Sequence, residues 1–265
     1  MENFINAASF SRALSNPAPH YHNSHQILYI TGGTAETTID DKKYLLKRHS
    51  LVLINRMETH SVKVSGDGYE RYELKISSRI LNSNSENNFL YSAILNRPKG
   101  FGHVIENYVG GEDIFKRIIS EYCSDSPYRD EMLALLLDML FIDIYRVSPS
   151  LFPEERTPAF DVVRQIQKQI ETNIKHRYTL SEFSEKYHLS SFYLSHLFKS
   201  VTGYSIMGYL KAARIAHARR LLTYSDKNIN EIIEDCGFTD ASNFSREFKE
   251  TVGVTPSDFR KKHKN

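Results

Sequence analysis

Two sets of side chains suited to contact with nucleic-acid bases and phosphates occur at matching places in the C-terminal half of the chain. The first set is Ser191, Phe192, Ser195, His196 and Lys199, and the second is Ser242, Asn243, Arg246 and Lys249. Arginine can pair with guanine and asparagine with adenine through two hydrogen bonds, whereas a phenylalanine ring can touch the methyl group of thymine. Lysine is better suited to phosphate oxygens, which set affinity rather than sequence choice. Any one of these side chains would also suit a solvated helix surface, so the inference depends on the repeated pattern.

A second group of candidate residues lies near the N-terminus. His20, His22 and Gln26 have the spacing His-x-His-x3-Gln, and His60 follows in a later segment. Three neutral imidazoles could hold a divalent transition metal, although Gln26 offers only a carbonyl oxygen. Three interpretations remain open: the group lines an effector pocket or bonds within the fold, it binds a metal, or it serves metal-dependent catalysis. We expect the first, an effector-binding role, with no bound metal or cofactor.

The two DNA-directed sets belong to a segment that is repeated. Leu180, Phe183 and Leu189 recur 49 residues later as Ile229, Ile232 and Phe238, while Leu194, Phe198 and Gly203 recur 50 residues later as Phe244, Phe248 and Gly253. Each copy predicts a short helix, a tight turn and a second amphipathic helix, which is the helix-turn-helix pattern. Gly237 is expected at the turn, because glycine adopts positive φ without a Cβ penalty. Thr255 and Pro256 predict the cap and first residue of a final helix.

Length and composition indicate an ordinary soluble protein of two domains. The chain has 265 residues, of which 40% are hydrophobic and 25% charged. Two cysteines, Cys123 and Cys236, support neither a disulfide framework nor a metal knuckle. Residues 161–265 carry 17 Lys and Arg against 12 Asp and Glu, whereas residues 1–160 carry 17 against 20. Basic charge is therefore concentrated in the repeated half, as in a polyanion-binding module. Neither a signal peptide nor a membrane span is evident, so we expect a cytoplasmic protein.

The N-terminal half changes to short segments typical of β-strands. Residues 1–19 have no clear period and are interpreted as an arm. Six strands are expected at 26–30, 35–39, 43–46, 50–54, 61–64 and 69–76, with turn signals at Gly32-Gly33, Asp40-Asp41 and Gly66-Asp67-Gly68. Many short, regularly spaced strands favour a small antiparallel sandwich or barrel. Residues 82–88 are expected to form a polar loop.

Two helices are expected after the strands, and the second is apolar on nearly every face. This helix, at about 132–145, must be covered by its own domain or by a second subunit. We favour a homodimer that contacts through Leu133, Leu136, Leu137 and Leu140. Three prolines between 148 and 158 then predict a domain linker. The expected domains are therefore 1–147 and 159–265, joined by 148–158.

Five separated phrases give a resemblance to a known family. They are Leu194-Ser-His-Leu-Phe-Lys199, Arg214-Ile-Ala-His-Ala218, Gly237-Phe-Thr-Asp240, Phe244-Ser-Arg-Glu-Phe-Lys249 and Gly253-Val-Thr-Pro-Ser257. Together they resemble the AraC/XylS family of transcription regulators over about residues 160–262. The resemblance implies a seven-helix domain whose two helix-turn-helix units enter successive major grooves on one face of DNA. Residues 20–146 are similar in layout to the cupin-like barrel and helices with which many relatives bind a small effector and dimerise.

We therefore expect a two-domain α+β protein: a cupin-like β-barrel with a helical pair, then an all-α domain with two helix-turn-helix units joined by a long helix. The expected function is a sequence-specific DNA-binding transcription regulator, not an enzyme, controlled by a small-molecule effector in the barrel. Expected partners are double-stranded DNA, the effector (a sugar is one candidate), a second copy, and RNA polymerase if the protein is an activator, with no membrane. Two alternatives stay open: a metal-binding cupin enzyme with a DNA-binding appendage, and an effectorless regulator whose N-terminal domain contacts another protein.

Overall fold

The chain divides into two compact units, Met1–Arg156 and Thr157–Asn265. The computed structural model describes residues 5–12, 16–20, 24–39, 41–55, 58–77, 90–95, 102–152 and 158–263, with the backbone alone for 16–20 and 263. The division between the units falls inside the segment that the prolines predict as a linker. No helix in these described ranges is long and apolar enough to cross a membrane.

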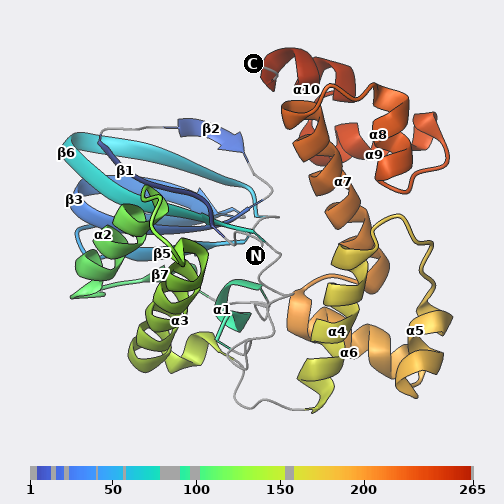
Figure 1. Cartoon of the computed structure of the whole chain (residues 1–265), viewed down its shortest axis with the longest axis horizontal. Helices are drawn as coiled ribbons and strands as arrows, with labels where there is room; N and C mark the ends of the chain where they lie inside the picture. The colour runs from blue at the N-terminus through green and yellow to red at the C-terminus, as the bar shows by residue number, and fades with distance from the viewer. Residues whose placement is uncertain are drawn as a thin grey trace. The chain divides into compact units, whose positions relative to one another are not determined.

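The first unit is built on an antiparallel sheet (Figure 1). In its described part the strands are β1 (Ile5–Arg12), β2 (Asn16–His20), β3 (His25–Ile39), β4 (Lys42–Leu46), β5 (Leu51–Ile54), β6 (His60–Ile76) and β7 (Val104–Ile105). Their order is β1-β6-β3-β5-β7, while β2 also pairs with β6 and β4 with β3. The sheet is therefore organised around the long β3–β6 pair.

Two pairs of predicted strands are each one continuous strand. β3 joins the predicted 26–30 and 35–39, and β6 joins 61–64 and 69–76. The β3–β6 register shifts on either side of Gly32. Gly33 has a φ of 65°, and a Cβ atom there would lie 2.6 Å from Tyr69 Cα. The glycines therefore bend the strands, as bulges do, instead of ending them.

The N-terminal segment is also part of the sheet, so its interpretation as an arm is wrong where the chain is described. β1 pairs with β6 over its length, and Ile5 is buried. β2 pairs with the other end of β6. The predicted polar loop at 82–88 lies outside the described residues.

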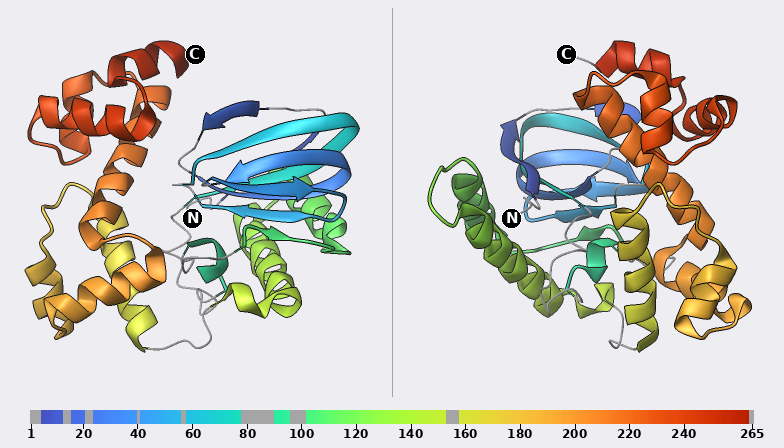
Figure 2. Two further views of the ribbon diagram at one scale, coloured as in Figure 1. Left: turned by 180° about the vertical axis from the view of Figure 1, so that it is seen from behind. Right: turned by 45° about the vertical axis from the view of Figure 1, so that its right-hand side comes forward.

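Each face of the bent sheet has its own apolar cluster. The inner cluster is Leu28, Ile30, Ala35, Ile39, Leu46, Val52, Ile54, Val62 and Tyr69. It draws residues from both halves of β3, so the sheet curls around it, in agreement with the expected barrel-like fold. The alternate side chains of β3 and β6 pack with the helices α2 (Gly111–Tyr122) and α3 (Arg129–Val147), which cover the other face (Figure 2). A short helix, α1 (Ser92–Leu95), joins the same outer cluster.

The apolar helix α3 is covered largely by its own unit. Leu133, Leu136, Leu137 and Leu140 are at most 2% exposed and belong to the outer cluster. These four leucines are therefore core residues and are not available at a dimer surface, contrary to the expectation from the sequence. Different apolar side chains of α3 remain exposed: Met132, Leu135 and Met139. A helix apolar on all faces does not reveal from its sequence which face its own domain covers.

The start of the predicted linker also packs on the first unit. A 3-10 turn spans Pro149–Leu151, and Phe152 is buried against the Tyr145 ring, with ring centroids 5.1 Å apart. The N-terminal part of the predicted linker therefore packs on the first unit.

The second unit is all-helical. Its described part contains α4 (Pro158–Thr172), α5 (Leu180–Tyr187), α6 (Ser191–Thr202), α7 (Ile206–Tyr224), α8 (Ile229–Asp235), α9 (Ala241–Val252) and α10 (Pro256–His263). Helix α7 runs from the α5–α6 pair to the α8–α9 pair (Figure 1). The two helix-turn-helix copies and the long connecting helix are thus confirmed.

Side-chain caps define where these helices begin. Six of them start behind a residue that accepts a hydrogen bond from a first-turn backbone N–H: Thr179, Ser190, Ser205, Asn228, Asp240 and Thr255. Each such cap stabilises a helix by about 0.5–2 kcal/mol. The caps therefore set the first residue that each recognition helix can present.

Candidate nucleic-acid interface

Most predicted contact residues of α6 lie on its exposed side. Leu194 and Phe198 are buried in the core, whereas His196 and Lys199 are exposed and Ser195 is half-buried. Phe192 is 75% exposed, and its ring centroid lies 4.5 Å from that of His196. An exposed aromatic pair at the start of a helix offers an apolar contact for a thymine methyl beside a hydrogen-bonding imidazole.

Ser191 is exposed but already engaged within the fold. Its hydroxyl oxygen lies 2.9 Å from that of Ser184 on α5, and Ser184 donates its own hydrogen to the Leu180 carbonyl. Ser191 must therefore be the donor in the serine pair, since a hydroxyl has one hydrogen. The bond ties α6 to α5, so Ser191 positions the recognition helix and keeps only lone pairs for another contact.

The second recognition helix, α9, presents a more strongly polar side. Phe244 and Phe248 are buried, whereas Ser242, Arg246 and Lys249 are exposed and Asn243 is half-buried. An Nη2 hydrogen of Arg246 is donated to Asn243 Oδ1 at 2.8 Å. The amide oxygen of Asn243 thus aligns the guanidinium, whose other donors remain able to bond a guanine edge.

The turn before α9 requires glycine for two reasons. Gly237 has a φ of 72°, and a Cβ atom there would lie 2.8 Å from Lys175 Cα and 2.9 Å from the Lys175 carbonyl oxygen. The equivalent residue of the first copy, His188, also adopts a left-handed φ, of 53°. Both copies therefore turn in the same way, and the second turn is packed directly on a neighbouring backbone. The sequence predicts the turn at Gly237 but not its neighbour.

The predicted effector-binding residues are only partly described. Gln26 and His60 are buried. His60 is paired with His20 in the β2–β6 ladder, whereas Gln26 lies opposite Lys75 near the other end of β6. The side chain of His20 and the whole of His22 lie outside the described residues. Among the residues that the structure does describe, no group of three or more His, Cys, Asp or Glu is placed to hold a metal ion.

The inner face of β6 carries charged residues that the sequence analysis did not single out. Arg71 is buried, and its Nη2 atom lies 3.3 Å from Glu73 Oε2. Both alternate along the strand with Tyr72 and so share a face with Tyr69 of the inner cluster. Burial raises the pKa of the Tyr69 hydroxyl. Alternation along 69–76 was the signal that could have placed this pair inside.

A second polar network, missed for a different reason, joins residues distant in sequence. The Tyr44 hydroxyl lies 2.8 Å from His103 Nδ1, and His103 Nε2 lies 3.1 Å from Glu58 Oε1. The other carboxylate oxygen of Glu58 accepts a hydrogen bond from the Asn55 backbone N–H at 2.7 Å. Spacing along the chain gives no hint of these contacts, since they are made by the fold.

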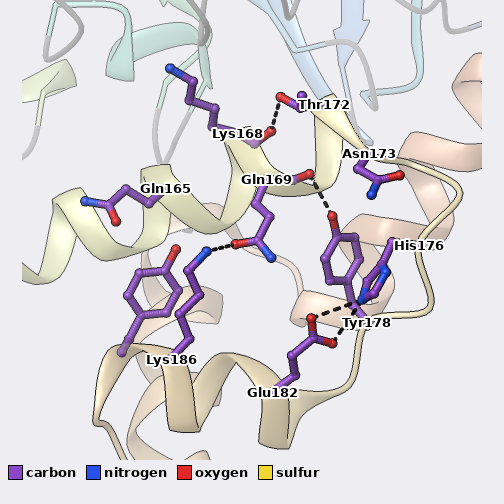
Figure 3. Close-up of a pocket in the computed structure, with 10 residues that line it drawn as sticks. Gln165, Lys168, Gln169, Thr172, Asn173, His176, Tyr178, Glu182 and Lys186 are labelled. Atoms are coloured by element: carbon purple, nitrogen blue, oxygen red, sulfur yellow. Dashed lines mark hydrogen bonds and ion pairs between the residues drawn. The ribbon is translucent and has the colours of Figure 1, made fainter.

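A surface groove of about 490 Å³ lies beside α4 and α5 (Figure 3). Its polar side chains bond one another: the Tyr178 hydroxyl donates to the Gln169 carbonyl at 2.9 Å, and Lys186 Nζ donates to Gln169 Oε1. His176 Nε2 lies 3.0 Å from a Glu182 carboxylate oxygen. These bonds hold α5 against α4, so the groove residues support the first helix-turn-helix unit.

Comparison with known proteins agrees with this geometry. Residues 183–262 match the model of a helix-turn-helix domain, and residues 13–156 match that of an AraC-like ligand binding domain. The HTH-type transcriptional activator RhaR of Escherichia coli (strain K12) is 26% identical over 252 residues, which cover 92% of this chain and 86% of RhaR. RhaR of Shigella flexneri is 26% identical over 251 residues, with the same coverage.

Two solved structures share the fold over the whole chain. ToxT from Vibrio cholerae has a TM-score of 0.64 at 16% identity, with all of both chains covered. Wild-type ToxT bound to unsaturated fatty acid has a TM-score of 0.63 at 17% identity, covering 98% of this chain and 97% of ToxT. At these identities the likeness concerns the fold.

Proposed function

Because the chain belongs to the AraC family of transcription regulators, with a ligand-binding and a helix-turn-helix domain, we propose that α6 and α9 read two separate blocks of bases. The observation that carries this proposal is the matched design of the two helices. Each buries two large apolar side chains, Leu194 and Phe198 in α6 and Phe244 and Phe248 in α9, and turns a polar side to solvent. Recognition helices present such outward residues to base edges in the major groove.

Selection of duplexes from random DNA by the full-length protein tests this function. The expected result is a motif of two short blocks whose centres lie about one helical turn, roughly 10 base pairs, apart. Recovery of a single block would assign base recognition to one helix alone. Absence of any preferred duplex would contradict sequence-specific binding.

We further propose that the inner side of the curled sheet receives the small effector. Gln26 shares a face of β3 with Leu28 of the inner cluster, His60 shares a face of β6 with Val62, and Arg71 shares one with Tyr69. A few buried polar groups within an apolar lining are typical of small-molecule sites. The AraC-like ligand binding domain, the name of RhaR as an activator and the fatty acid bound to ToxT support a regulator of this kind. RNA polymerase would then be a further partner.

Thermal unfolding in the presence of sugars or unsaturated fatty acids tests the effector site. One class should stabilise the protein, by about 2.7 kcal/mol at a concentration of 100 Kd. Arg71→Gln should abolish stabilisation by a ligand with a carboxylate. Lys63→Gln, which removes an exposed cation of the same strand, should preserve it. Failure of both classes would favour the effectorless alternative, whereas stoichiometric metal together with enzymatic activity would favour the cupin enzyme.

We also propose that the protein is a homodimer, through a revised surface on α3. Met132, Leu135 and Met139 recur at helical spacing and are exposed in the described structure. A contiguous exposed apolar stripe is typical of an interaction surface. A two-fold pair would bring the same stripe of each copy together and allow two DNA-binding domains to act at once.

Leu135→Asp should convert the dimer into a monomer in analytical ultracentrifugation, because Leu135 is 59% exposed and a carboxylate would be buried in the interface. Val109→Asp, an equivalent change at an exposed apolar residue outside α3, should leave the dimer intact. A wild-type protein that sediments as a monomer at all concentrations would contradict the proposal.

A further inference from the structure

The two helix-turn-helix units are joined by more than the connecting helix α7. The loop between α4 and α5 also contacts the turn between α8 and α9. Lys175 Nζ in that loop lies 2.6 Å from Asp235 Oδ1, and the other oxygen of Asp235 pairs with Lys227. Hydrogen bonds from Lys175, and next in size from Lys227, lower the pKa of the Asp235 carboxyl group to about 2. The Asp235 carboxylate is therefore charged throughout the physiological range and is able to pair with both lysines there.

Arg214 of α7 connects the same two segments. Its Nε donates to the Ile174 carbonyl at 3.1 Å, and its Nη2 donates to the His176 carbonyl at 2.9 Å. On the other side, the guanidinium carbon lies 5.7 Å from the Phe238 ring centroid. The Arg214 side chain thus bonds the α4–α5 loop of the first helix-turn-helix unit and packs on the α8–α9 turn of the second.

The backbone of the two segments is also in close approach. The space where Gly237 would carry a Cβ atom is filled by Lys175 Cα, the Lys175 carbonyl and Arg214 Nη2. Close packing of this kind resists sliding and rotation of the two segments against each other. An exposed ion pair adds little rigidity, whereas charged hydrogen bonds to carbonyls add more.

These contacts form a second connection between the two helix-turn-helix units. α7 connects the units along the chain, and the contacts of Lys175, Arg214, Asp235 and Gly237 connect them across its side; we call these four residues the bridge. A single connecting helix leaves each unit able to rotate about its packing contacts at one end. A second connection removes that freedom.

We propose that the bridge fixes the spacing and angle between α6 and α9, so that the protein selects DNA by the distance between its two base blocks as well as by the bases. This inference rests on the proposed reading of two base blocks. It assigns a role in specificity to residues that do not need to touch DNA.

The test uses full-length protein and the duplex that wild type selects from random DNA. Three altered duplexes are compared: one base pair inserted between the blocks, one removed, and the second block scrambled. Wild type should bind the insertion and deletion duplexes at least about tenfold more weakly. We call this loss of affinity on the insertion and deletion duplexes the spacing penalty. It should shrink by about threefold in Arg214→Lys, and to a smaller degree in Lys175→Ala, because α6 and α9 are then held less firmly relative to each other. Affinity for the scrambled duplex should stay within about twofold of wild type.

Lys227→Ala is the matched control. It removes the other lysine that pairs with the Asp235 carboxylate. Lys227 and Asp235 both belong to the second helix-turn-helix unit, so their contact does not connect the two units and the wild-type spacing penalty should remain. Circular dichroism checks that each variant is folded. If Arg214→Lys does not fold, the result with Lys175→Ala decides the test. An unchanged spacing penalty in the folded bridge variants would overturn the proposal. A wild-type protein without any preferred duplex would instead overturn the proposed function.

Discussion

Replacing Gly237 with alanine will destabilise the C-terminal helical domain. The loss should be larger than for the same substitution at the other turn glycines of that domain. The left-handed backbone conformation costs an alanine about 1–2 kcal/mol. The added Cβ would also lie 2.8 Å from Lys175 Cα, and overpacking of this kind costs about 1–3 kcal/mol more. Urea unfolding of the full-length protein, followed by circular dichroism of the helical signal, measures the loss.

Gly253→Ala separates the two causes. Gly253 has a φ of 84° at the end of α9, but apart from its own chain neighbours no heavy atom lies within 4 Å of the position of its Cβ. It should therefore lose only the conformational part, about 1–2 kcal/mol. Equal destabilisation by the two substitutions would show that the close approach to Lys175 has no energetic weight.

Arg246→Ala should weaken binding to the selected duplex by about 1–3 kcal/mol, or roughly 5- to 160-fold, and relax the preference at one base. The reason is that Arg246 is exposed on α9 and its guanidinium is aligned by Asn243 Oδ1. Fluorescence anisotropy with the selected duplex and its single-base variants measures both effects.

Two other residues of α9 provide controls for Arg246. Thr251→Ala, at an exposed residue near the other end of the same helix whose hydroxyl bonds the Glu247 carbonyl, should change neither affinity nor base preference. Lys249→Ala should weaken binding to specific and random duplexes alike and reduce the salt dependence, as loss of a phosphate contact does. If Arg246→Ala behaves like Lys249→Ala, Arg246 contacts phosphate and not a base.

The helical domain was predictable because its signals are local. Turn glycines, caps and the spacing of buried aromatics all occur within single helix-turn-helix copies, and repetition makes them independent of any one residue. Gly237, Thr255 and Pro256 are found at the places that their chemistry indicates. The outward residues of α6 and α9 follow from which side the phenylalanines bury.

The parts that were not predictable depend on contacts between distant segments. Gly32 and Gly33 carry the same signal whether a strand ends or bends, and only pairing with β6 decides the outcome. The four leucines of α3 are buried because a sheet lies beside them. Likewise, Lys175 and Asp235 are 60 residues apart, and no periodicity brings them together.

The caps of the two recognition helices affect how each helix can interact with the phosphates of DNA. α6 starts behind the neutral Ser190, whereas α9 starts behind the Asp240 carboxylate, which accepts from the Ser242 and Asn243 N–H groups at 3.2 and 2.7 Å. Amides at a helix start attract phosphate. At α6 the Ser190 hydroxyl accepts from one of them, that of Tyr193, whereas at α9 a carboxylate accepts from two and adds a negative charge that repels phosphate. The two copies are thus electrically unequal at the start of their recognition helices: α9 carries a negative charge there that α6 lacks, so its phosphate contacts must come from cations elsewhere on the helix, such as Lys249.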